Sequence, residues 1–482
     1  MSVKNTIADY LNEHSESDNG IYELDTGLSK SYAQVVETAN IINNTLVIGE
    51  GSILTVVLPN SILYVEYFVA SMLGGWIFNP IPYFTQVQEL DKILSYVNPD
   101  FIITDRNDII KSCKDTHKLI SSHDYLKSDY KKIVSNIRSD MPAALYYSSG
   151  TTGNPKGVIY THENMVSLIG SIVRGFKFSK KDRQLALLPF GHTASINYNI
   201  LPSLMVGCDL YISQGFEKLR SNFFKVLSDY KITYTQIVPT ILFVLNKLKV
   251  DISKIDLLDI SFIGCGSSTL PIKAQDEFFD KYNIPISNLY GLSETGPSHI
   301  DDPRELGWSS GSIGQPLDVN ECKISIDGEI LLKGKNIFHS YHKNKKLYDK
   351  VVEDEWFHTG DLGFIKEGKF YFSDRKKDLI ILGGINIVPM EIEEVLYNHL
   401  NVLECAVVGK KNDLHGEEIV AVIVPRDSSY DQKKFSQELK KICKEKLSSY
   451  KIPRIIYFWE SIPKTHSKKI MRRKVRDEVN NY

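Results

Sequence analysis

Short apolar runs alternate with amphipathic stretches over about the first 300 residues of the chain. ILTVVL at 53–58 and FIIT at 101–104 are typical of buried strands, because each is short, apolar and rich in β-branched residues. Similar runs lie at 184–188, 232–238 and 260–264. Helical spacing is predicted between them, at 61–73, 217–230 and 271–279. This alternation predicts parallel βαβ units in which helices cover a sheet.

The pattern changes towards the C-terminus. CKISI and EILLKG flank the pair Asp327-Gly328, which suits a hairpin turn that requires positive φ, and GFIKEGKFYF at 363–372 predicts a second hairpin. After Lys377 the chain begins a new pattern, with two helices and two strands predicted at 389–400, 404–409, 418–424 and 436–447. We therefore predict an α/β fold with a large multi-sheet unit over residues 1–377 and a small α+β unit over residues 378–482.

Composition narrows the class of protein. The 482 residues are 42% hydrophobic and 24% charged, which is ordinary for a globular protein and excludes intrinsic disorder. The six cysteines are scattered with no close pair, so neither a zinc site nor a thiol-redox motif is predicted, and a reducing compartment is favoured. The first 20 residues carry no apolar run after a basic start, so we expect no secretion signal. No apolar run reaches the roughly 20 residues that a membrane span needs. We expect a cytoplasmic protein.

Charge is unevenly distributed along the chain. The net charge is −2, but the residues from Asp431 to the end include 15 basic and 6 acidic side chains, so this part carries +9. A basic region can bind nucleic acid, a membrane surface or a small phosphate-rich ligand, whereas the simpler interpretation is a solvated helical face.

The segment YYSSGTTGNPKGVIYTHENM at 146–165 has the composition of a phosphate-binding loop. Its glycines allow backbone N–H groups to turn towards an anion, its hydroxyls add donors, and Lys156 adds a positive charge. It is not the P-loop of common NTPases, because Gly157 follows the lysine and the glycine spacing differs. The alternative is a flexible surface loop. We expect the segment to follow an apolar strand and to precede a helix.

This loop resembles the signature loop of the adenylate-forming (ANL) superfamily, which contains acyl-CoA synthetases, carrier-protein-loading adenylation domains and firefly-type luciferases. Further segments resemble other motifs of that family in the family's order, namely NLYGLSET (288–295), HTGD (358–361), SDRKKDLIILGGINIVPMEIE (373–393) and PKTHSKKIMRR (463–473). The resemblance covers the chain from about residue 25 to about residue 476. It implies a large adenylation domain followed by a small mobile lid.

The resemblance also implies which residues bind the nucleotide. Tyr290 would stack on adenine, Asp361 would accept hydrogen bonds from the ribose hydroxyls, and Arg375 would lie near the ribose. Glu294 and Thr151 would hold Mg²⁺. The full set of cofactor-binding candidates is Ser148, Ser149, Gly150, Thr151, Thr152, Gly153, Lys156, Asn288, Tyr290, Gly291, Ser293, Asp361, Arg375, Gly383 and Gly384.

The remaining implied roles belong to catalysis and to movement of the lid. Lys469 stands at the position of the family's catalytic lysine, Glu294 and His192 are the other catalytic candidates, and Asp378 is the predicted hinge. Gly383 and Gly384 would line the channel for the pantetheine arm in the thiol-transfer step. Each has a simpler interpretation: a helix-capping acid for Glu294, a solvated lysine in a basic run for Lys469, a core histidine for His192, and plain turns for Asp361 and the glycine pair.

The resemblance implies that ATP, Mg²⁺ and a carboxylic acid give an acyl-adenylate and pyrophosphate, and that the acyl group then passes to CoA. Transfer to the phosphopantetheine of an acidic carrier protein is the alternative, and a luciferase-like oxygenase or a nucleotide-binding protein without catalysis are further ones. Gly191 stands where amino-acid-activating members carry an aspartate for the ammonium group. An ammonium buried without that partner is costly, so we expect a fatty, aromatic or other simple acid.

Overall fold

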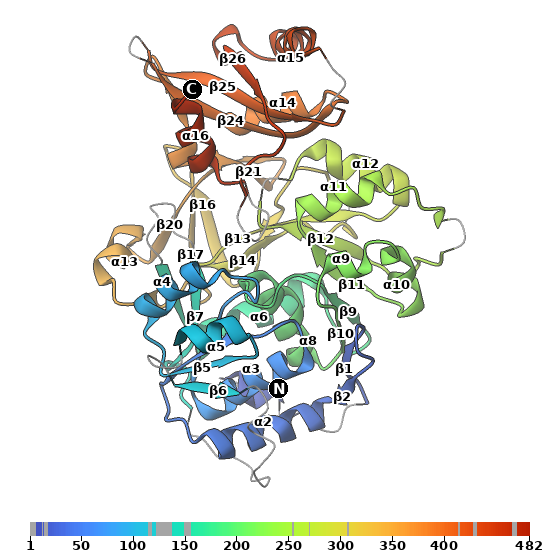
Figure 1. Cartoon of the computed structure of the whole chain (residues 1–482), viewed down its shortest axis with the longest axis vertical. Helices are drawn as coiled ribbons and strands as arrows, with labels where there is room; N and C mark the ends of the chain where they lie inside the picture. The colour runs from blue at the N-terminus through green and yellow to red at the C-terminus, as the bar shows by residue number, and fades with distance from the viewer. Residues whose placement is uncertain are drawn as a thin grey trace.

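The computed structural model describes residues 6–11, 13, 18–113, 118–121, 137–148, 156–252, 255–268, 270–305, 308–412, 415–427, 431–464 and 470–482. The chain forms a large N-terminal body and a smaller C-terminal unit, which sits above the body in Figure 1. The described strands form four sheets, three in the body and one in the C-terminal unit.

The widest sheet crosses the middle of the body. Its order is β15-β14-β13-β12-β11-β9-β10-β1-β2, and the strands from β13 to β1 run parallel. Its strands are β1 Gly20–Glu23, β2 Ser29–Ser31, β9 Arg183–Ala186, β10 Asp209–Ile212, β11 Tyr234–Ile237, β12 Phe262–Gly266, β13 Ile286–Leu292, β14 Gly296–Ile300 and β15 Gln315–Pro316. Because helices cover both faces, the central strands are buried along their whole length.

A second sheet lies beside the first, with the order β18-β8-β7-β4-β3-β5-β6. Its strands are β3 Ile53–Val57, β4 Ile77–Pro80, β5 Phe101–Thr104, β6 Leu119–Ser121, β7 Pro142–Ser148, β8 Lys156–Thr161 and β18 Ser340–Tyr341. The strands β7, β4, β3, β5 and β6 are parallel, whereas β8 pairs antiparallel with β7. The phosphate-loop segment therefore begins at the end of β7 and includes β8, and the helix expected after it, α6 His162–Phe176, follows β8.

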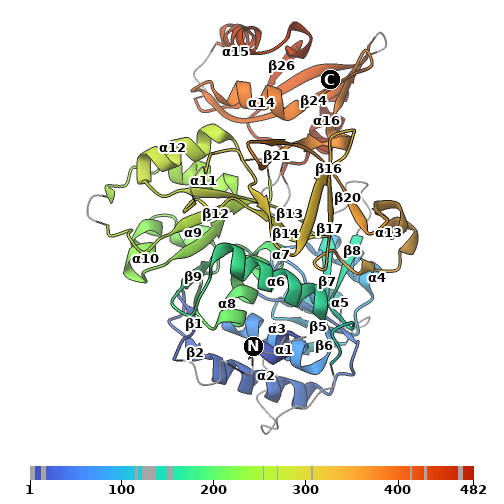
Figure 2. The same cartoon turned by 180° about the vertical axis from the view of Figure 1, so that it is seen from behind.

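The third sheet of the body is antiparallel and leads to the C-terminal unit. It contains β16 Asn320–Ile324, β17 Glu329–Gly334, β19 Val352–Glu353, β20 Trp356–Lys366 and β21 Lys369–Arg375. Both predicted hairpins are present, as β16–β17 and as β20–β21. Gly328 and Gly368 adopt positive φ at their turns. Figure 2 places β16, β17 and β20 directly beneath the C-terminal unit.

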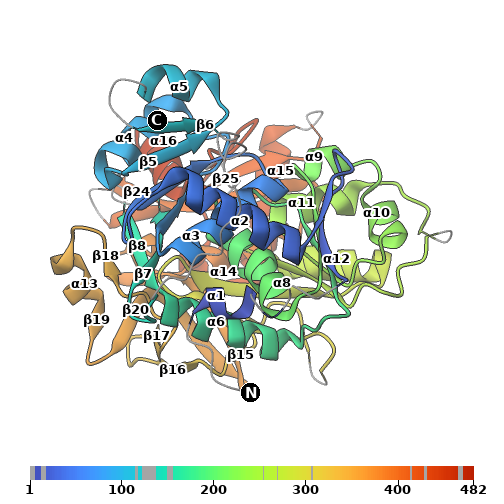
Figure 3. The same ribbon diagram turned by 90° about the horizontal axis from the view of Figure 1, so that it is seen from below.

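Helices cover the sheets of the body. They are α1 Ile7–Leu11, α2 Tyr32–Leu46, α3 Ile62–Gly74, α4 Val87–Val97, α5 Asn107–Cys113, α6 His162–Phe176, α7 Thr193–Ser195, α8 Leu201–Val206, α9 Phe216–Leu219, α10 Phe223–Asp229, α11 Pro239–Lys247, α12 Ile272–Tyr282 and α13 Lys345–Val351. Ser31 and Thr161 begin α2 and α6 with capping boxes. Seen from below in Figure 3, α2 and α3 lie on the side of the body opposite the C-terminal unit.

One predicted helix was wrong in extent. The stretch 217–230 forms two helices, α9 and α10, because Asn222 leaves the helical conformation between them. The break lets Phe216 and Leu219 on one helix, and Phe223 on the other, contact a single apolar cluster. The predicted strands at 53–58, 101–104, 184–188, 232–238 and 260–264 all match described strands to within a few residues.

The C-terminal unit has its own sheet and its own apolar clusters. Its elements are β22 Ile380–Leu382, β23 Ile385–Ile387, α14 Pro389–Tyr397, β24 Val402–Asn412, β25 Gly416–Pro425, α15 Gln432–Lys446, β26 Ile455–Phe458 and α16 Arg472–Asn480. One cluster packs α14 and α15 against the sheet, and the other packs α16 against the opposite face. A 3₁₀ turn, Lys376–Asp378, connects this unit to β21. The division at residue 377 stays a prediction, which this arrangement supports.

No described helix combines the length and the apolar character that a membrane crossing requires. All six cysteines lie in the described parts of the chain, and no disulfide joins any of them there. The basic helix α15 lies on the side of the C-terminal unit that faces away from the body in Figure 1.

A buried ion pair joins α16 to α14. Arg472 donates to both carboxylate oxygens of Glu393, at 2.5 and 2.7 Å, and to the backbone oxygen of Val407. The Glu393 side chain is 4% exposed. Removing one partner would leave a buried charge uncompensated, which is strongly destabilising.

We predict that Arg472→Met destabilises the C-terminal unit by about 3–5 kcal/mol. The matched control is Arg473→Met on the same helix, since the ion pair of Arg473 with Asp477 is exposed and is worth at most about 1 kcal/mol. Urea unfolding and protease digestion of the full chain measure the difference. Equal effects of the two substitutions would contradict the stabilising role of the buried pair.

Candidate functional site

A cavity of about 1430 Å³ lies where the body meets the C-terminal unit. The body contributes the ends of β11 and β13, the middle of β20 and most of the chain from Leu187 to Tyr198, while the C-terminal unit contributes Leu403, Glu404 and Lys464. The wall is charged near the connection between the units and largely apolar on the side of α11. These two compartments have different chemistry.

The charged compartment is built around Asp361, whose side chain is buried. Oδ2 of Asp361 accepts a hydrogen bond from the Tyr290 hydroxyl at 2.9 Å, and Oδ1 lies 3.1 Å from Nε of Arg375. Burial lowers the pKa of the Arg375 guanidinium, but Asp361 and Asp378 outweigh that effect and the net pKa is raised. The site therefore presents a fixed carboxylate beside a permanent cation.

A second charged group lies near β8 and β18. Tyr341 donates from its hydroxyl to Oε1 of Glu294 at 2.7 Å, and Nζ of Lys156 lies 5.7 Å from the centre of the Tyr341 ring. Burial and the neighbouring Glu294 raise the pKa of Tyr341, so this hydroxyl stays a donor. Glu294 and Lys156 both line the cavity. Glu294 and Lys156, which belong to motifs far apart in the sequence, therefore lie on the same wall of the cavity.

The residues near Glu294 fit Mg²⁺ only if a phosphate also binds. No group of three or more potential His, Cys, Asp or Glu ligands occurs within the described ranges. Mg²⁺ is usually held by one or two carboxylates together with substrate phosphates and water, rather than by a cage of protein ligands. Glu294 is a carboxylate of this kind.

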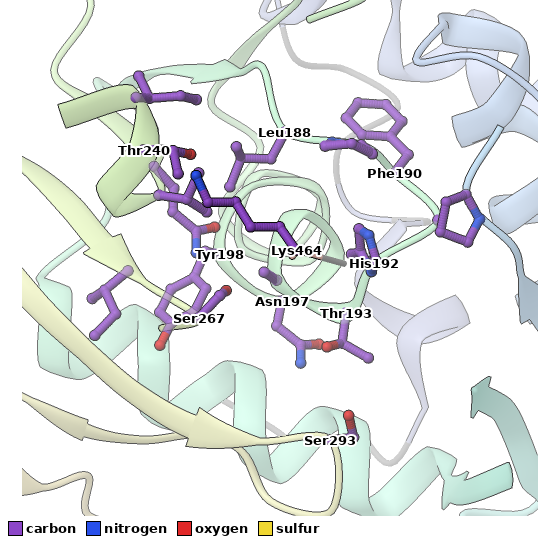
Figure 4. Close-up of a pocket in the computed structure, with 18 of the residues that line it drawn as sticks. Leu188, Phe190, His192, Thr193, Asn197, Tyr198, Thr240, Ser267, Ser293 and Lys464 are labelled. Carbon is purple, nitrogen blue, oxygen red and sulfur yellow. The ribbon is translucent and has the colours of Figure 1, made fainter. Parts of the chain in front are cut away.

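The apolar compartment is lined by Leu188, Phe190, Tyr198, Val238 and Ile241, among others. Figure 4 shows its labelled polar side chains, which include His192, Asn197, Thr240 and Ser267. His192 lies at the start of α7 and lines the cavity, as its resemblance-based role requires.

Gly191 has a structural reason to lack a side chain. A Cβ at this position would lie 2.1 Å from the backbone nitrogen of Pro82 and 2.4 Å from the carbonyl carbon of Ile81. Backbone atoms cannot move aside as a flexible side chain can. An aspartate is therefore sterically excluded here, which strengthens the inference that no α-ammonium group is bound at this point.

The structure brings many of the predicted residues to the cavity wall, namely Lys156, His192, Gly291, Ser293, Glu294, Asp361 and Arg375. Ser148 ends β7, directly before the phosphate loop. Thr151, the other predicted metal ligand, and Lys469 lie outside the described residues, as do Ser149, Gly150, Thr152 and Gly153.

Tyr290 and Asn288 do not line the cavity among the described residues. The Tyr290 ring is 8% exposed and packs against His299 and Phe372, with ring centres 5.3 and 6.1 Å away. An adenine-stacking face is therefore not presented in this structure. The observed contact of Tyr290 is its hydroxyl on Asp361, which orients that carboxylate.

Gly383 and Gly384 are also away from the cavity. They form the exposed turn between β22 and β23, both with positive φ. Neither would meet another atom within 4 Å if a Cβ were added. In this arrangement of the two units the glycine pair faces solvent, and Asp378 lies on the connecting 3₁₀ turn.

Several residues that line the cavity were not among the predicted site residues. Lys464 forms an ion pair with Glu404, both from the C-terminal unit, and Figure 4 shows its side chain lying over the cavity. Gln236 on β11 lines the inner wall. Lys464 falls within the last motif, so its position was a usable signal. Gln236 could have been noticed only as a polar residue within an otherwise apolar strand, which is a weak indication of a binding site.

Comparison with known proteins agrees with this geometry. The family model for the AMP-binding enzyme matches residues 13–342, and that for the AMP-binding enzyme C-terminal domain matches residues 391–469. A 2-succinylbenzoate–CoA ligase of Listeria monocytogenes is 34% identical over 362 residues, covering 74% of this chain and 75% of that protein.

Two solved structures share the fold. O-succinylbenzoate coenzyme A synthetase from Bacillus subtilis, in complex with ATP and magnesium ion, superposes with a TM-score of 0.85 at 26% identity over 97% of this chain and 99% of the other. ATP-bound MatB from Rhodopseudomonas palustris gives 0.91 at 21% identity over 99% of each chain. These matches confirm the predicted fold class. The chain belongs to the AMP-binding enzymes, the adenylate-forming superfamily that its motifs resemble, and it is an acid–thiol ligase of this family.

Proposed function

We propose that the chain activates a carboxylic acid with ATP to an acyl-adenylate, releases pyrophosphate, and passes the acyl group to the thiol of CoA. The observation that carries the proposal is a continuous cavity in which a charged compartment around Asp361 opens into an apolar one. An acyl-adenylate has this same division, because a polar nucleotide is joined to an organic acyl group. A reaction that consumes ATP and CoA also fits the expected cytoplasmic location.

The chemical difficulty is that a carboxylate must approach the α-phosphate of ATP, which is also an anion. Catalysis must therefore neutralise charge and position the reacting atoms. Asp361 would accept hydrogen bonds from the ribose hydroxyls, while Arg375 balances its charge. Lys156 would supply positive charge near the phosphates.

Glu294 would hold Mg²⁺ together with Thr151 and the phosphate oxygens. The ion supplies charge neutralisation on the triphosphate when bound. Tyr341 keeps Glu294 in place through its 2.7 Å hydrogen bond and retains its own proton, since its pKa is raised. His192 would lie beside the acid in the apolar compartment.

Lys469 would bridge the substrate carboxylate and the α-phosphate. What supports this assignment is the position of the flanking chain, because Lys464 lines the cavity and forms an antiparallel bridge with Ile470. The motif that contains Lys469 is thus anchored on both sides at the mouth of the site.

Transfer to the thiol would need a different arrangement of the C-terminal unit. A rotation about Asp378 would withdraw the Lys469 segment and bring Gly383 and Gly384 towards the cavity. The exposed, unobstructed turn that carries the glycine pair is compatible with such a movement. CoA is preferred to a carrier protein as acceptor because the relative from Listeria monocytogenes is named as a CoA ligase. The basic helix α15, on the far side of the unit, gives no specific support to a carrier protein.

The function is tested by incubating the full chain with ATP, Mg²⁺ and a panel of fatty, aromatic and other carboxylic acids, with and without CoA. We expect pyrophosphate release that depends on the acid, and consumption of CoA thiol that depends on both. Release without any thiol transfer would contradict the ligase assignment. Failure to consume ATP with every acid would contradict the whole proposal.

The two half-reactions should respond to different substitutions. Lys469→Ala is expected to slow adenylation by at least ~100-fold because it removes the cation that joins the two anions, while thiol transfer from preformed acyl-adenylate is largely kept. Asp378→Pro is expected to do the opposite, since proline fixes φ at the pivot. Separate assays of each half-reaction measure this, and a parallel loss of both in either variant would contradict its assignment.

The contact between Tyr290 and Asp361 predicts a nucleotide-specific defect. Tyr290→Phe removes one hydroxyl that donates to a carboxylate, an interaction worth roughly 1.5–3 kcal/mol. We expect the KM for ATP to rise about 10-fold or more, while the KM for the acid changes little. Tyr371→Phe is the control, because that hydroxyl contacts only exposed Ser309 in the described structure. An unchanged KM for ATP would show that Asp361 needs no such support.

A further inference from the structure

A bulge in β20 carries Asp361 to the cavity wall. The strands β17 and β20 pair as far as His358 and again at Leu362, with a shift of register between these points. Three residues of β20, at 359–361, therefore stand opposite the single residue Ile330 of β17. Such a bulge interrupts the regular hydrogen bonds between strands and redirects the side chains that it carries. All three residues of this bulge line the cavity.

Side chains take over the hydrogen bonds that the bulge interrupts. The backbone nitrogen of Gly360 donates to Oε1 of Glu329 on β17 at 2.8 Å. The backbone nitrogen of Asp361 donates to Oγ1 of Thr359 at 3.1 Å, and the Thr359 hydroxyl donates to the backbone oxygen of Ile330 at 2.6 Å. Gly360 has a φ of 70°, a conformation that favours glycine. Glu329 thus holds the residue directly before Asp361 in this conformation.

The second carboxylate oxygen of Glu329 has partners of its own. Oε2 accepts from Nζ of Lys376 at 3.3 Å and lies 3.3 Å from Nδ1 of His358. Glu329 is only 5% exposed, and a carboxylate buried to this degree needs such partners. With one oxygen on Gly360 and the other on Lys376 and His358, the orientation of the carboxylate is determined from both sides.

Glu329 itself lies behind the cavity wall. It is not among the described residues that line the cavity, whereas Gly360, Asp361 and Lys376 are. A bound nucleotide would therefore contact the residues that Glu329 holds rather than Glu329. Any influence of this carboxylate on the reaction must pass through the bulge.

We propose that Glu329 is a positioning residue for the nucleotide, because its carboxylate fixes the bulge in the conformation that directs Asp361 at the ribose hydroxyls. The inference rests on the proposed function, which assigns Asp361 to the ribose. Without Glu329, the Gly360 nitrogen would lose its partner on β17 and the bulge would be free to shift. A displacement of about 1 Å at a binding group can cost about 100-fold in rate.

The test compares ATP with 2′,3′-dideoxy-ATP, which lacks both ribose hydroxyls. The ratio of the two kcat/KM values for pyrophosphate release reports how well the ribose is held. We expect the natural chain to favour ATP at least ~10-fold, since hydrogen bonds to a carboxylate are lost with the analogue. Glu329→Leu should reduce this ratio at least ~5-fold by raising the KM for ATP, while the KM for the acid changes little. A merely structural loss of active protein would lower both kcat/KM values alike and leave the ratio unchanged.

Asp327→Asn is the matched control. Asp327 accepts from the same Lys376 side chain at 2.6 Å but makes no contact with the bulge among the described interactions. Asn-Gly suits the hairpin turn as well as Asp-Gly does, so the turn should be kept. This variant loses one carboxylate beside Lys376, as Glu329→Leu does, and should keep the ratio of the natural chain.

Glu329→Asp serves if the leucine variant fails to fold, which thermal unfolding detects. The shorter side chain keeps a negative charge beside Lys376 and His358 but withdraws it from the Gly360 nitrogen by one methylene group. We expect the ratio between ATP and 2′,3′-dideoxy-ATP to fall in this variant also.

The outcomes separate the two claims. If the folded Glu329 variants keep the ratio of the natural chain, positioning by Glu329 is overturned while the ligase function stands. An equal fall of the ratio in Asp327→Asn would also overturn it, because the effect would then come from Lys376. If no acid supports pyrophosphate release from ATP, it is the proposed function that fails.

Discussion

The ion pair between Asp361 and Arg375 is the contact on which the arrangement of the site depends. The two residues are direct partners across β20 and β21, and Arg375 is the last residue before the 3₁₀ turn that leads to the C-terminal unit. A carboxylate as buried as Asp361 needs a nearby cation and a hydrogen-bond donor, which Arg375 and Tyr290 provide. These three residues therefore hold the charged part of the nucleotide compartment together. One of them, Arg375, also lies directly before the turn at which the C-terminal unit begins.

The position of these three residues gives a physical reason why binding of the nucleotide and movement of the C-terminal unit should be coupled. Tyr290 comes from the widest sheet, Asp361 from the antiparallel sheet, and Arg375 from the end of β21 in that same sheet, directly before the connection to the next unit. A ligand on Asp361 therefore contacts a point where two sheets meet beside the start of that connection. The apolar compartment, in contrast, is formed within the body by β11, η3 Ile196–Ile200 and the segment around Gly191. The acid can be selected by a fixed wall while the C-terminal unit changes position.

Many of the strands, turns and motif residues could be predicted from the sequence, because local sequence patterns determine them. Apolar runs such as 53–58 gave buried strands, and Asp327-Gly328 gave its hairpin turn. The motif residues Glu294, Asp361 and Arg375 were found because short motifs retain their order and spacing. The helix over 217–230 was wrong because its apolar spacing continues through Asn222, where tertiary packing breaks the helix.

The walls of the acid compartment could not be predicted in the same way. Gln236 and Asn197 come from segments that are distant in sequence and meet only in the folded chain. No local periodicity distinguishes Gln236, which lines the cavity, from a core glutamine such as Gln275. Likewise, Gly191 was identified as a departure from the aspartate of amino-acid-activating relatives, but its contact with the backbone of Pro82 required coordinates.

A crystal structure of the chain with a non-hydrolysable acyl-adenylate analogue tests the central claim most directly. We predict that both ribose hydroxyls lie within about 2.7–3.2 Å of the Asp361 carboxylate, with the acyl group in the apolar compartment of the same cavity. An analogue bound with its ribose away from Asp361, or with its acyl group outside that compartment, would contradict this prediction.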